Sequence, residues 1–295
     1  MRSLLLIPIL LFSLMLEGQN EFDKYGPFGS EVYTDLKLAL DIETKVYKMD
    51  LSYKKIDPKY FAKISKLKNL QALKLSGNEV KEYPKDFCDL SNLVYFATYN
   101  NEFSSFPPDL KKLYNLNYLE FFGAKIDSVP SEIAYLSKLK TLKISSTNDT
   151  LHLPPTLKYL KSLSDLTIEN CVLDSFPKEI FRLTNLKYLN LTNVNMFFIT
   201  KHFERFQNLE VLVLDANHLN EIPRDIYKAS KLRLLSVKAN NLEKLPDTIC
   251  LMENLALLDI RGNHFSKDEI DILKALLPGC EIRYDVIKDD KAPQN

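Results

Sequence analysis

One apolar spacing recurs along most of the chain and constrains its fold more than any other feature. A run of leucines restarts every 23 residues and, at one step, after 24 residues. The starting residues are Leu70, Leu93, Leu116, Leu139, Leu163, Leu186, Leu209, Leu232 and Leu255. A divergent first copy opens at Val46 and brings the number of copies to ten. An internal period of this length is typical of solenoids, in which each copy packs on the next.

Each copy divides into two halves with different patterns. The first half reads LxxLxL and is followed, after two further residues, often by asparagine, as in the copy that starts at Leu209. Alternation of this kind predicts a short strand with its leucines on one side and variable residues on the other. The second half carries a proline at one register: Pro84, Pro107, Pro130, Pro154, Pro177, Pro223 and Pro246. Because proline fixes φ and ends strand pairing, a short helical return segment is expected after it.

These motifs resemble the leucine-rich repeat family, specifically its bacterial-type repeats with LPxxI return segments, over residues 46–265. The resemblance implies an α/β solenoid, a curved horseshoe with a parallel sheet on the concave face, short helical turns on the convex side and a cap at each end. It also implies a buried ladder of asparagines at the ninth position of the copies: Asn78, Asn101, Asn217, Asn240 and Asn263. Four successive middle copies lack that asparagine and carry Ala124, Thr147, Cys171 and Val194 instead. We therefore expect less regular coils in the middle of the array, with a bulge near Asn148.

The first eighteen residues have the layout of a secretory signal peptide, with Arg2 followed by an apolar run from Leu4 to Leu16. As a helix this run would span about 20 Å, less than the roughly 30 Å hydrocarbon core of a bilayer, so stable membrane insertion is not expected. We predict cleavage after Gly18 and a secreted, periplasmic or cell-surface location. The alternative is an intracellular protein that keeps its leader.

Segments on either side of the repeats are expected to cap the solenoid, because its end coils would otherwise expose apolar surface. In residues 19–45, Thr34 is predicted to cap a short helix that lies across the first coil. In residues 266–285, the spacing of Ser266 and Glu269 predicts a capping box, a helix and then a terminal strand. Residues 286–295 form a polar tail.

Several classes of function are disfavoured by composition. The 39 basic and 39 acidic residues leave no net charge, so there is no basic field to bind nucleic acid. None of the seven glycines stands in a GxGxxG or GxxxxGK[ST] motif, so nucleotide cofactors are not expected. The four histidines and four cysteines show no metal-ligand or catalytic spacing, and the cysteines are expected to be free thiols. We expect a protein that is not an enzyme and needs no cofactor or metal.

The variable strand positions should line the concave face, which the resemblance implies is the partner-binding surface. In the third and fourth copies these positions hold Tyr95, Tyr99, Tyr118 and Phe122. Since neighbouring strands lie about 4.8 Å apart, the four rings are expected to form one exposed patch suited to anchoring a partner. The alternative is that tyrosine simply favours strands and covers its neighbours.

A second candidate contact zone lies near the other end of the array. Val211, Val213, Leu234 and Leu257 would form an aliphatic strip on the same face. The competing explanations are burial under the capping helix or a surface for self-association.

Together these features predict a non-enzymatic, exported leucine-rich repeat module that binds another protein through its concave face. A glycan or cell-wall ligand is the alternative from another class, with the tyrosines stacking on sugar rings. An intracellular signalling scaffold is the third hypothesis.

Overall fold

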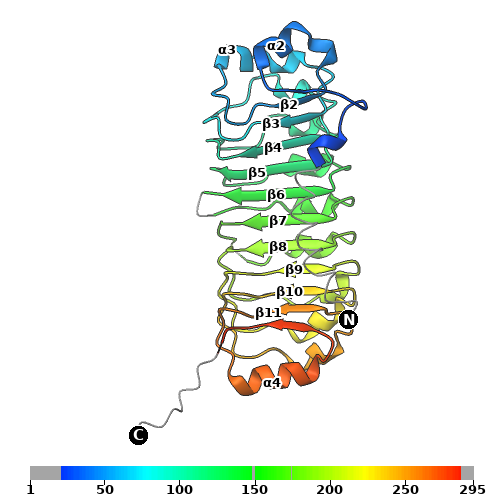
Figure 1. Ribbon diagram of the computed structural model, residues 1–295, viewed down its shortest axis with the longest axis vertical. Coiled ribbons are helices and arrows are strands. Elements are labelled where there is room, and N and C mark those ends of the chain that lie inside the picture. The colour runs from blue at the N-terminus through cyan, green and yellow to red at the C-terminus, as the bar shows by residue number, and fades with distance from the viewer. Residues whose placement is uncertain (1–20, 148–149, 174, 287–295) are drawn as a thin grey trace.

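The computed structural model describes residues 21–147, 150–173 and 175–286, and in them twelve strands form one parallel sheet in chain order (Figure 1). The strands are β1 (Val32–Tyr33), β2 (Lys48–Asp50), β3 (Ala72–Lys74), β4 (Tyr95–Tyr99), β5 (Tyr118–Ala124), β6 (Thr141–Ser146), β7 (Asp165–Glu169), β8 (Tyr188–Thr192), β9 (Val211–Val213), β10 (Leu234–Ser236), β11 (Leu257–Asp259) and β12 (Glu281–Arg283). The expected signal peptide, residues 1–18, and residues 287–295 of the expected tail lie outside the described residues.

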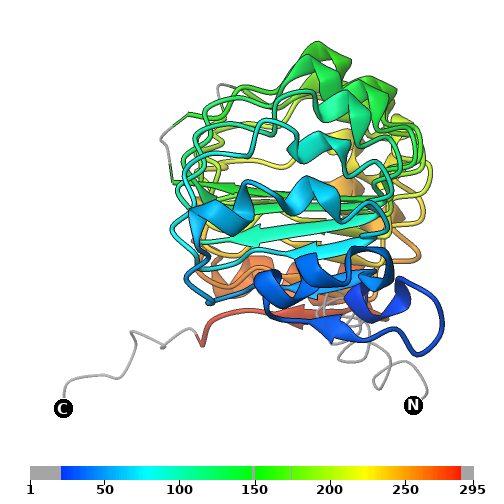
Figure 2. The same ribbon diagram turned by 90° about the horizontal axis from the view of Figure 1, so that it is seen from above.

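Short helices connect the strands on the far side of each coil. The α-helices of the described residues are α2 (Leu36–Asp41), α3 (Pro58–Phe61) and α4 (Lys267–Leu276). The 3₁₀ helices are η1 (Phe22–Lys24), η2 (Glu43–Lys45), η3 (Ile64–Lys66), η4 (Phe87–Asp89), η5 (Leu110–Lys112), η6 (Ser131–Tyr135), η7 (Pro155–Tyr159), η8 (Lys178–Arg182), η9 (Phe203–Arg205), η10 (Arg224–Lys228) and η11 (Asp247–Leu251). Figure 2, a view from above, shows the middle coils (green) set back from the blue and orange ends, so the sheet presents a concave face. The predicted solenoid is confirmed.

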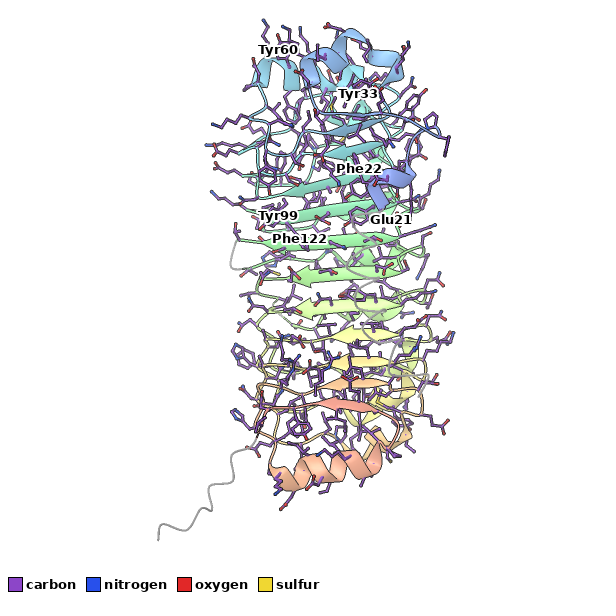
Figure 3. All side chains as sticks on the ribbon, in the orientation of Figure 1. Glu21, Phe22, Tyr33, Tyr60, Tyr99 and Phe122 are labelled. Atoms are coloured by element: carbon purple, nitrogen blue, oxygen red, sulfur yellow. The ribbon has the colours of Figure 1, made fainter. Side chains whose placement is uncertain are left out.

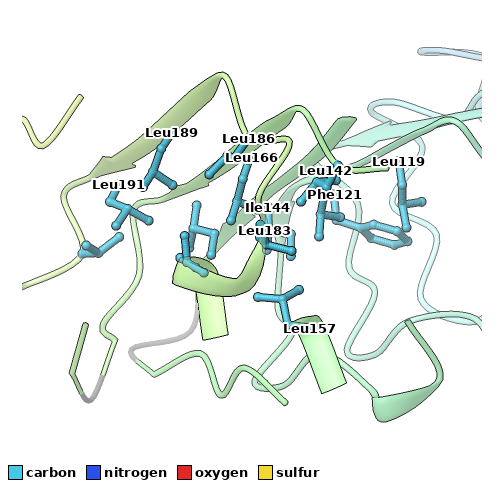
Figure 4. Packing of buried hydrophobic residues seen from close by; sticks show 14 of the residues in the cluster. Leu119, Phe121, Leu142, Ile144, Leu157, Leu166, Leu183, Leu186, Leu189 and Leu191 are labelled. Atoms are coloured by element: carbon cyan, nitrogen blue, oxygen red, sulfur yellow. The ribbon is translucent and has the colours of Figure 1, made fainter. Parts of the chain in front are cut away.

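A single hydrophobic core runs through the coils from Leu36 to Leu277. The second residue of each strand points into it, and Figure 4 shows Leu119, Leu142 and Leu166 side by side, with Leu157 and Leu183 of the return segments facing them. All five of these leucines are fully buried or nearly so. Because each leucine contacts residues of the adjacent coils, the core is shared between coils and not contained within any one of them.

The predicted asparagine ladder is present where the sequence supplies asparagine. Asn217 is buried, and its Oδ1 accepts hydrogen bonds from the backbone N–H groups of Val194 and Met196, each at 3.1 Å. Its Nδ2 donates to the carbonyls of Leu191 at 2.8 Å and Leu214 at 2.9 Å. The side chain therefore joins its own turn to the preceding coil, and it satisfies backbone groups that would otherwise be buried without partners.

Strand length varies along the sheet. The strands β2, β3, β9, β10 and β11 have three residues each, whereas β4, β5, β6, β7 and β8 have five to seven. The longer strands include β4, whose copy carries Asn101, so the ladder asparagine alone does not set strand length. The register of β5 against β6 shifts between Phe121 and Ala124, one coil before the bulge expected at Asn148, which lies outside the described residues.

A second ladder was not anticipated from the sequence. It is formed by asparagines that directly precede the first leucine of a copy, and each donates Nδ2–H to a carbonyl of the preceding coil at 2.7–2.9 Å. Its members are Asn69, Asn92, Asn115, Asn185, Asn208 and Asn254. Lys138 and Lys231 occupy the same position in two other copies, and each Nζ donates to the asparagine one coil earlier at 2.7 Å.

Both ends of the core are covered by capping elements. The cap of α2 is Asp35, whose Oδ1 accepts from the Leu38 N–H at 3.0 Å, and not Thr34 as predicted. At the other end Ser266 Oγ accepts from the Glu269 N–H at 3.2 Å, as the spacing predicts, and α4 begins there. The strand β1 extends the sheet ahead of the first copy by pairing with β2, which the repeat pattern did not indicate.

Replacing Asn217 by alanine should destabilise the array far more than replacing a solvent-exposed ladder asparagine. Asn217→Ala leaves buried backbone groups of two coils unpaired, which is expected to lower the free energy of unfolding by about 2–4 kcal/mol. Asn254→Ala, the matched control, removes one exposed hydrogen bond to the Ser230 carbonyl and should cost about 0.5–1 kcal/mol. Urea unfolding followed by circular dichroism measures both. Equal losses would contradict the buried ladder as the principal joint between coils.

Candidate functional site

The candidate site is the concave face of the sheet, where in-register pairing aligns equivalent residues of consecutive strands in rows. The first residues of β3–β11 form one row: Ala72, Tyr95, Tyr118, Thr141, Asp165, Tyr188, Val211, Leu234 and Leu257. This set is termed the first row. Its neighbours are one strand apart, so each side chain in the row can contact the next.

Tyr95 and Tyr118 stack in the first row, with ring centroids 4.4 Å apart and planes inclined by 12°. The expectation that they are exposed is wrong, because they are only 2% and 3% accessible. Residues 21–30, termed the N-terminal strap, lie over them: the Phe22 ring meets Tyr95 edge-on at 5.5 Å and the Tyr25 ring lies 5.9 Å away. Figure 3 shows Phe22 and Glu21 in front of the sheet at the level of these strands.

Besides stacking on Tyr95, the Tyr118 side chain contacts two charged residues, Glu120 and Lys143. Its hydroxyl donates to the Glu120 carboxylate, and the Lys143 Nζ lies 5.4 Å from the ring centroid. Burial is the largest cause that raises the pKa of both Tyr95 and Tyr118, and the charge of Glu120 raises the pKa further. Both phenols are therefore neutral over the physiological range.

Tyr99 and Phe122 are paired in register at the carboxyl ends of β4 and β5. Tyr99 is 49% exposed and Phe122 is half-buried. Figure 3 places both residues toward the other end of the strands from Phe22. The four predicted aromatic residues therefore form two pairs. Tyr95 and Tyr118, termed the covered pair, are buried, and Tyr99 and Phe122, termed the accessible pair, are not.

The aliphatic strip is also less accessible than expected. Val211, Leu234 and Leu257 are 2–3% exposed and pack together in one cluster, with Val213 half-buried beside them. The expectation of an open apolar surface is wrong for these three residues, since in-register neighbours in the first row contact and cover one another.

Charged residues border the aliphatic cluster at the carboxyl ends of its strands. Ser236 Oγ donates to Asp215 Oδ1 at 2.5 Å, and the Lys238 N–H donates to the same oxygen at 2.9 Å. Arg261 Nε donates to Asp259 Oδ1 at 2.9 Å, in a two-pronged contact that its terminal nitrogen completes with Oδ2. Partial burial raises the pKa of Asp215, and these hydrogen bonds oppose that rise. We term Asp215, Ser236, Lys238, Asp259 and Arg261 the polar rim, and these hydrogen bonds hold its side chains in place.

Groups suited to chemistry are not brought together in the part of the chain that the structure describes. No three histidine, cysteine, aspartate or glutamate side chains there could hold a metal ion. The four cysteines are free, and burial raises the pKa of Cys88, Cys171 and Cys280 to about 12. Cys88 Sγ also donates to the Pro108 carbonyl at 2.8 Å. These three thiols are therefore held protonated and are poor nucleophiles.

Thiol labelling should distinguish one cysteine from the other three. Near pH 8, Cys250, which is exposed, is expected to react quickly with a disulfide reagent. Cys88, Cys171 and Cys280 should react much more slowly, because a pKa near 12 leaves little thiolate. The expected count is one fast thiol in the folded chain and four after denaturation. A second thiol that reacts as quickly in the folded chain would contradict the burial described above.

Comparison with protein families places the fold in a known class. A leucine-rich repeat region model matches residues 100–215, and a leucine rich repeat model matches residues 207–265. The two matches together span residues 100–265, and the chain belongs to the leucine-rich repeat family. This family is typically composed of binding modules without catalytic activity. No curated protein matches the chain in sequence.

Solved structures with the same fold come from bacteria and plants. An internalin of Listeria monocytogenes, InlF, is 17% identical with a TM-score of 0.54, and the alignment covers 76% of this chain and 78% of that one. The functional domain of InlJ from the same organism, which includes a cysteine ladder, is 16% identical with a TM-score of 0.61 and coverages of 75% and 45%. The plant peptide hormone receptor RGFR1, solved in complex with RGF2, is 20% identical with a TM-score of 0.59 and coverages of 79% and 42%.

These likenesses show the fold alone. The chain spans less than half the length of the InlJ and RGFR1 chains that it matches. Among the described residues, none of the helices is both long and apolar enough to cross a bilayer.

Proposed function

We propose that this chain is an exported, non-enzymatic leucine-rich repeat protein that binds a protein partner through its concave face. The observation that carries the proposal is the accessible aromatic pair, Tyr99 and Phe122, on a rigid sheet. Aromatic side chains bury a large area with few rotatable bonds, so they are effective anchors at protein interfaces. The peptide-bound receptor among the structural neighbours supports a protein ligand as the kind of partner.

The stacked coils support binding without rearrangement. Asn101 joins the coil of Tyr99 to the preceding coil, Asn115 joins the coil of Phe122 to that of Tyr99, and in-register strands hold Tyr99 beside Phe122. A surface that is already ordered loses little conformational entropy when a partner docks, so more of the contact energy contributes to affinity.

The six other predicted contact residues are proposed to have two different roles, direct contact with the partner or support of the surface from beneath. Val213, which is half-buried, is proposed as a secondary contact beside the polar rim of Asp215 and Lys238. The buried residues Tyr95, Tyr118, Val211, Leu234 and Leu257 are proposed to support the surface from within the first row.

Removing the accessible aromatic pair should weaken capture of the partner without unfolding the array. Tyr99→Ser with Phe122→Ser is expected to lower affinity at least about tenfold, as the loss of an aromatic anchor does. The matched control is Tyr135→Ser with Tyr159→Ser, which removes two tyrosines of the helical side that are 63% and 55% exposed. Pull-down from an extract of the native surroundings, with crosslinking and identification of the captured protein, measures the effect. Thermal midpoints verify folding.

Unchanged capture by the concave-face variant, or an equal loss in the control, would contradict the proposed surface. Saturable binding to a sugar on a glycan array, lost with the same two residues, would replace the protein ligand by a glycan.

Export requires that the leader be removed. We expect N-terminal sequencing of the purified protein from its native host to start at Gln19, and the protein to be found outside the cytoplasm after cell fractionation. An intact Met1 in the cytoplasmic fraction would contradict export and favour an intracellular scaffold.

A further inference from the structure

We infer that the covered pair, Tyr95 and Tyr118, is a binding site for a peptide turn with two aromatic side chains three residues apart, and that the N-terminal strap occupies this site as a ligand in cis. The inference extends the proposed function by naming the chemistry of the partner. It rests on how the strap is attached to the sheet, which differs from how the capping helices α2 and α4 are attached.

The strap contacts the sheet mainly through two rings. Phe22 inserts until it is 3% exposed, with its edge on Tyr95 and the Lys74 Nζ 4.3 Å from its centroid. Tyr25, one helical turn later, is half-buried, and its ring centroid lies 5.9 Å from that of Tyr95. The site therefore receives an aromatic side chain at position i in a closed pocket and another at position i+3 on its rim.

The backbone of the strap adds little to its attachment. The Gly26 N–H donates to Gln71 Oε1 at 2.9 Å, and pairing with the sheet starts only at Val32, where β1 meets β2. By contrast, α2 and α4 contribute several residues each to the main core. Phe22, Tyr95, Tyr118, Ala72 and Ala97 form a separate cluster.

The strap has the features of a preformed ligand. Glu21 accepts hydrogen bonds from the Tyr25 hydroxyl and from Lys24, and these bonds close a turn that presents both rings to the same side. Gly26 and Gly29 have positive φ, at 84° and 78°, and the Ser30 N–H donates to the Pro27 carbonyl to close a turn that contains Gly29. Phe28 in this turn is fully exposed, and Pro27 and Gly29 on either side of it are exposed as well, so the tip of the turn is not packed on the sheet.

The strap is attached in a way that allows it to dissociate from the sheet. It is held by two rings and one backbone hydrogen bond, and the segment that links it to β1 contains two glycines, so it can leave the sheet while the core remains folded. When it leaves, Tyr95 and Tyr118 become an open aromatic clamp with Lys74 at its edge. A partner segment with the pattern acidic, aromatic, two residues, aromatic, glycine would then form the contacts that Glu21, Phe22, Tyr25 and Gly26 form in cis.

The test uses a fluorescent peptide of residues 21–30 as the probe and the full chain as the receptor. Phe22→Ala with Tyr25→Ala in the chain empties the site, and the peptide should bind this variant saturably in an anisotropy titration. The unsubstituted chain should bind the peptide at least about tenfold more weakly, because its own strap occupies the site most of the time. A peptide that carries the same two alanines is the matched control and should not bind.

A site variant completes the test. Tyr118→Ser, added to the emptied chain, should abolish peptide binding while circular dichroism reports an unchanged fold. Absence of binding to the emptied chain, equal binding to both chains, or binding that survives Tyr118→Ser would each overturn the inference. If the emptied chain is unfolded, hydrogen exchange of the unsubstituted chain provides the test. The inference predicts that amides of residues 21–30 exchange faster than those of β4. Equal or slower exchange would show that the strap is a permanent part of the fold and would overturn the inference.

The outcome is separable from that of the proposed function. Partner capture that depends on Tyr99 and Phe122 while the peptide fails to bind would reject the clamp alone. Peptide binding without any effect of the Tyr99 and Phe122 substitutions would reject the accessible pair alone.

Discussion

The hydrogen bonds and apolar contacts between one coil and the next are the interactions on which the rest of the structure depends. A coil of this length buries too little apolar surface to offset the entropy of ordering it, so its stability has to come from neighbours. Two ladders supply directional contacts: the buried asparagines such as Asn217 and the outer asparagines such as Asn115. Both bind backbone groups of the preceding coil, so where they are present they help to fix the offset between coils. The copies of β6 and β7 lack both asparagines, and there the pairing of the strands themselves holds the coils in register.

In-register pairing in turn converts the repeat into a patterned surface. Residues 23 apart in sequence become neighbours in a row, which is why Tyr95 stacks on Tyr118 and why Leu234 lies between Val211 and Leu257. The variation between copies therefore appears as zones: aromatic over β4 and β5, charged over β6 and β7, aliphatic over β9–β11. Each zone contains at least two adjacent copies, and zones of that size match the contacts of a protein partner better than isolated side chains do.

Much of this could be read from the sequence, because the repeat is local and periodic. The copies and the cap at Ser266 follow from spacing, and the buried ladder follows from the resemblance to the leucine-rich repeat family. The outer ladder has a signal in the sequence too, an asparagine directly before six of the nine repeated leucines, but the position is polar and at least partly exposed, so spacing alone does not indicate that its side chain binds the preceding coil. Asp35 rather than Thr34 caps α2, because adjacent residues of similar capping ability cannot be separated by spacing alone.

The covering of Tyr95 and Tyr118 could not be derived in the same way. Phe22 and Tyr95 are 73 positions apart in the sequence, and Phe22 lies outside the repeat, so no periodicity relates them. The two aromatic pairs nevertheless lie on the same strands, with the residues of each pair four positions from those of the other, a separation of about 13 Å along a strand. A ligand that contacts Tyr99 and Phe122 alone leaves the strap in place, whereas a longer one that also reaches Tyr95 and Tyr118 has to displace Phe22 and Tyr25. Its apparent affinity is reduced by the fraction of molecules in which the strap is open, so the strap selects for partners that offer aromatic contacts strong enough to replace its own.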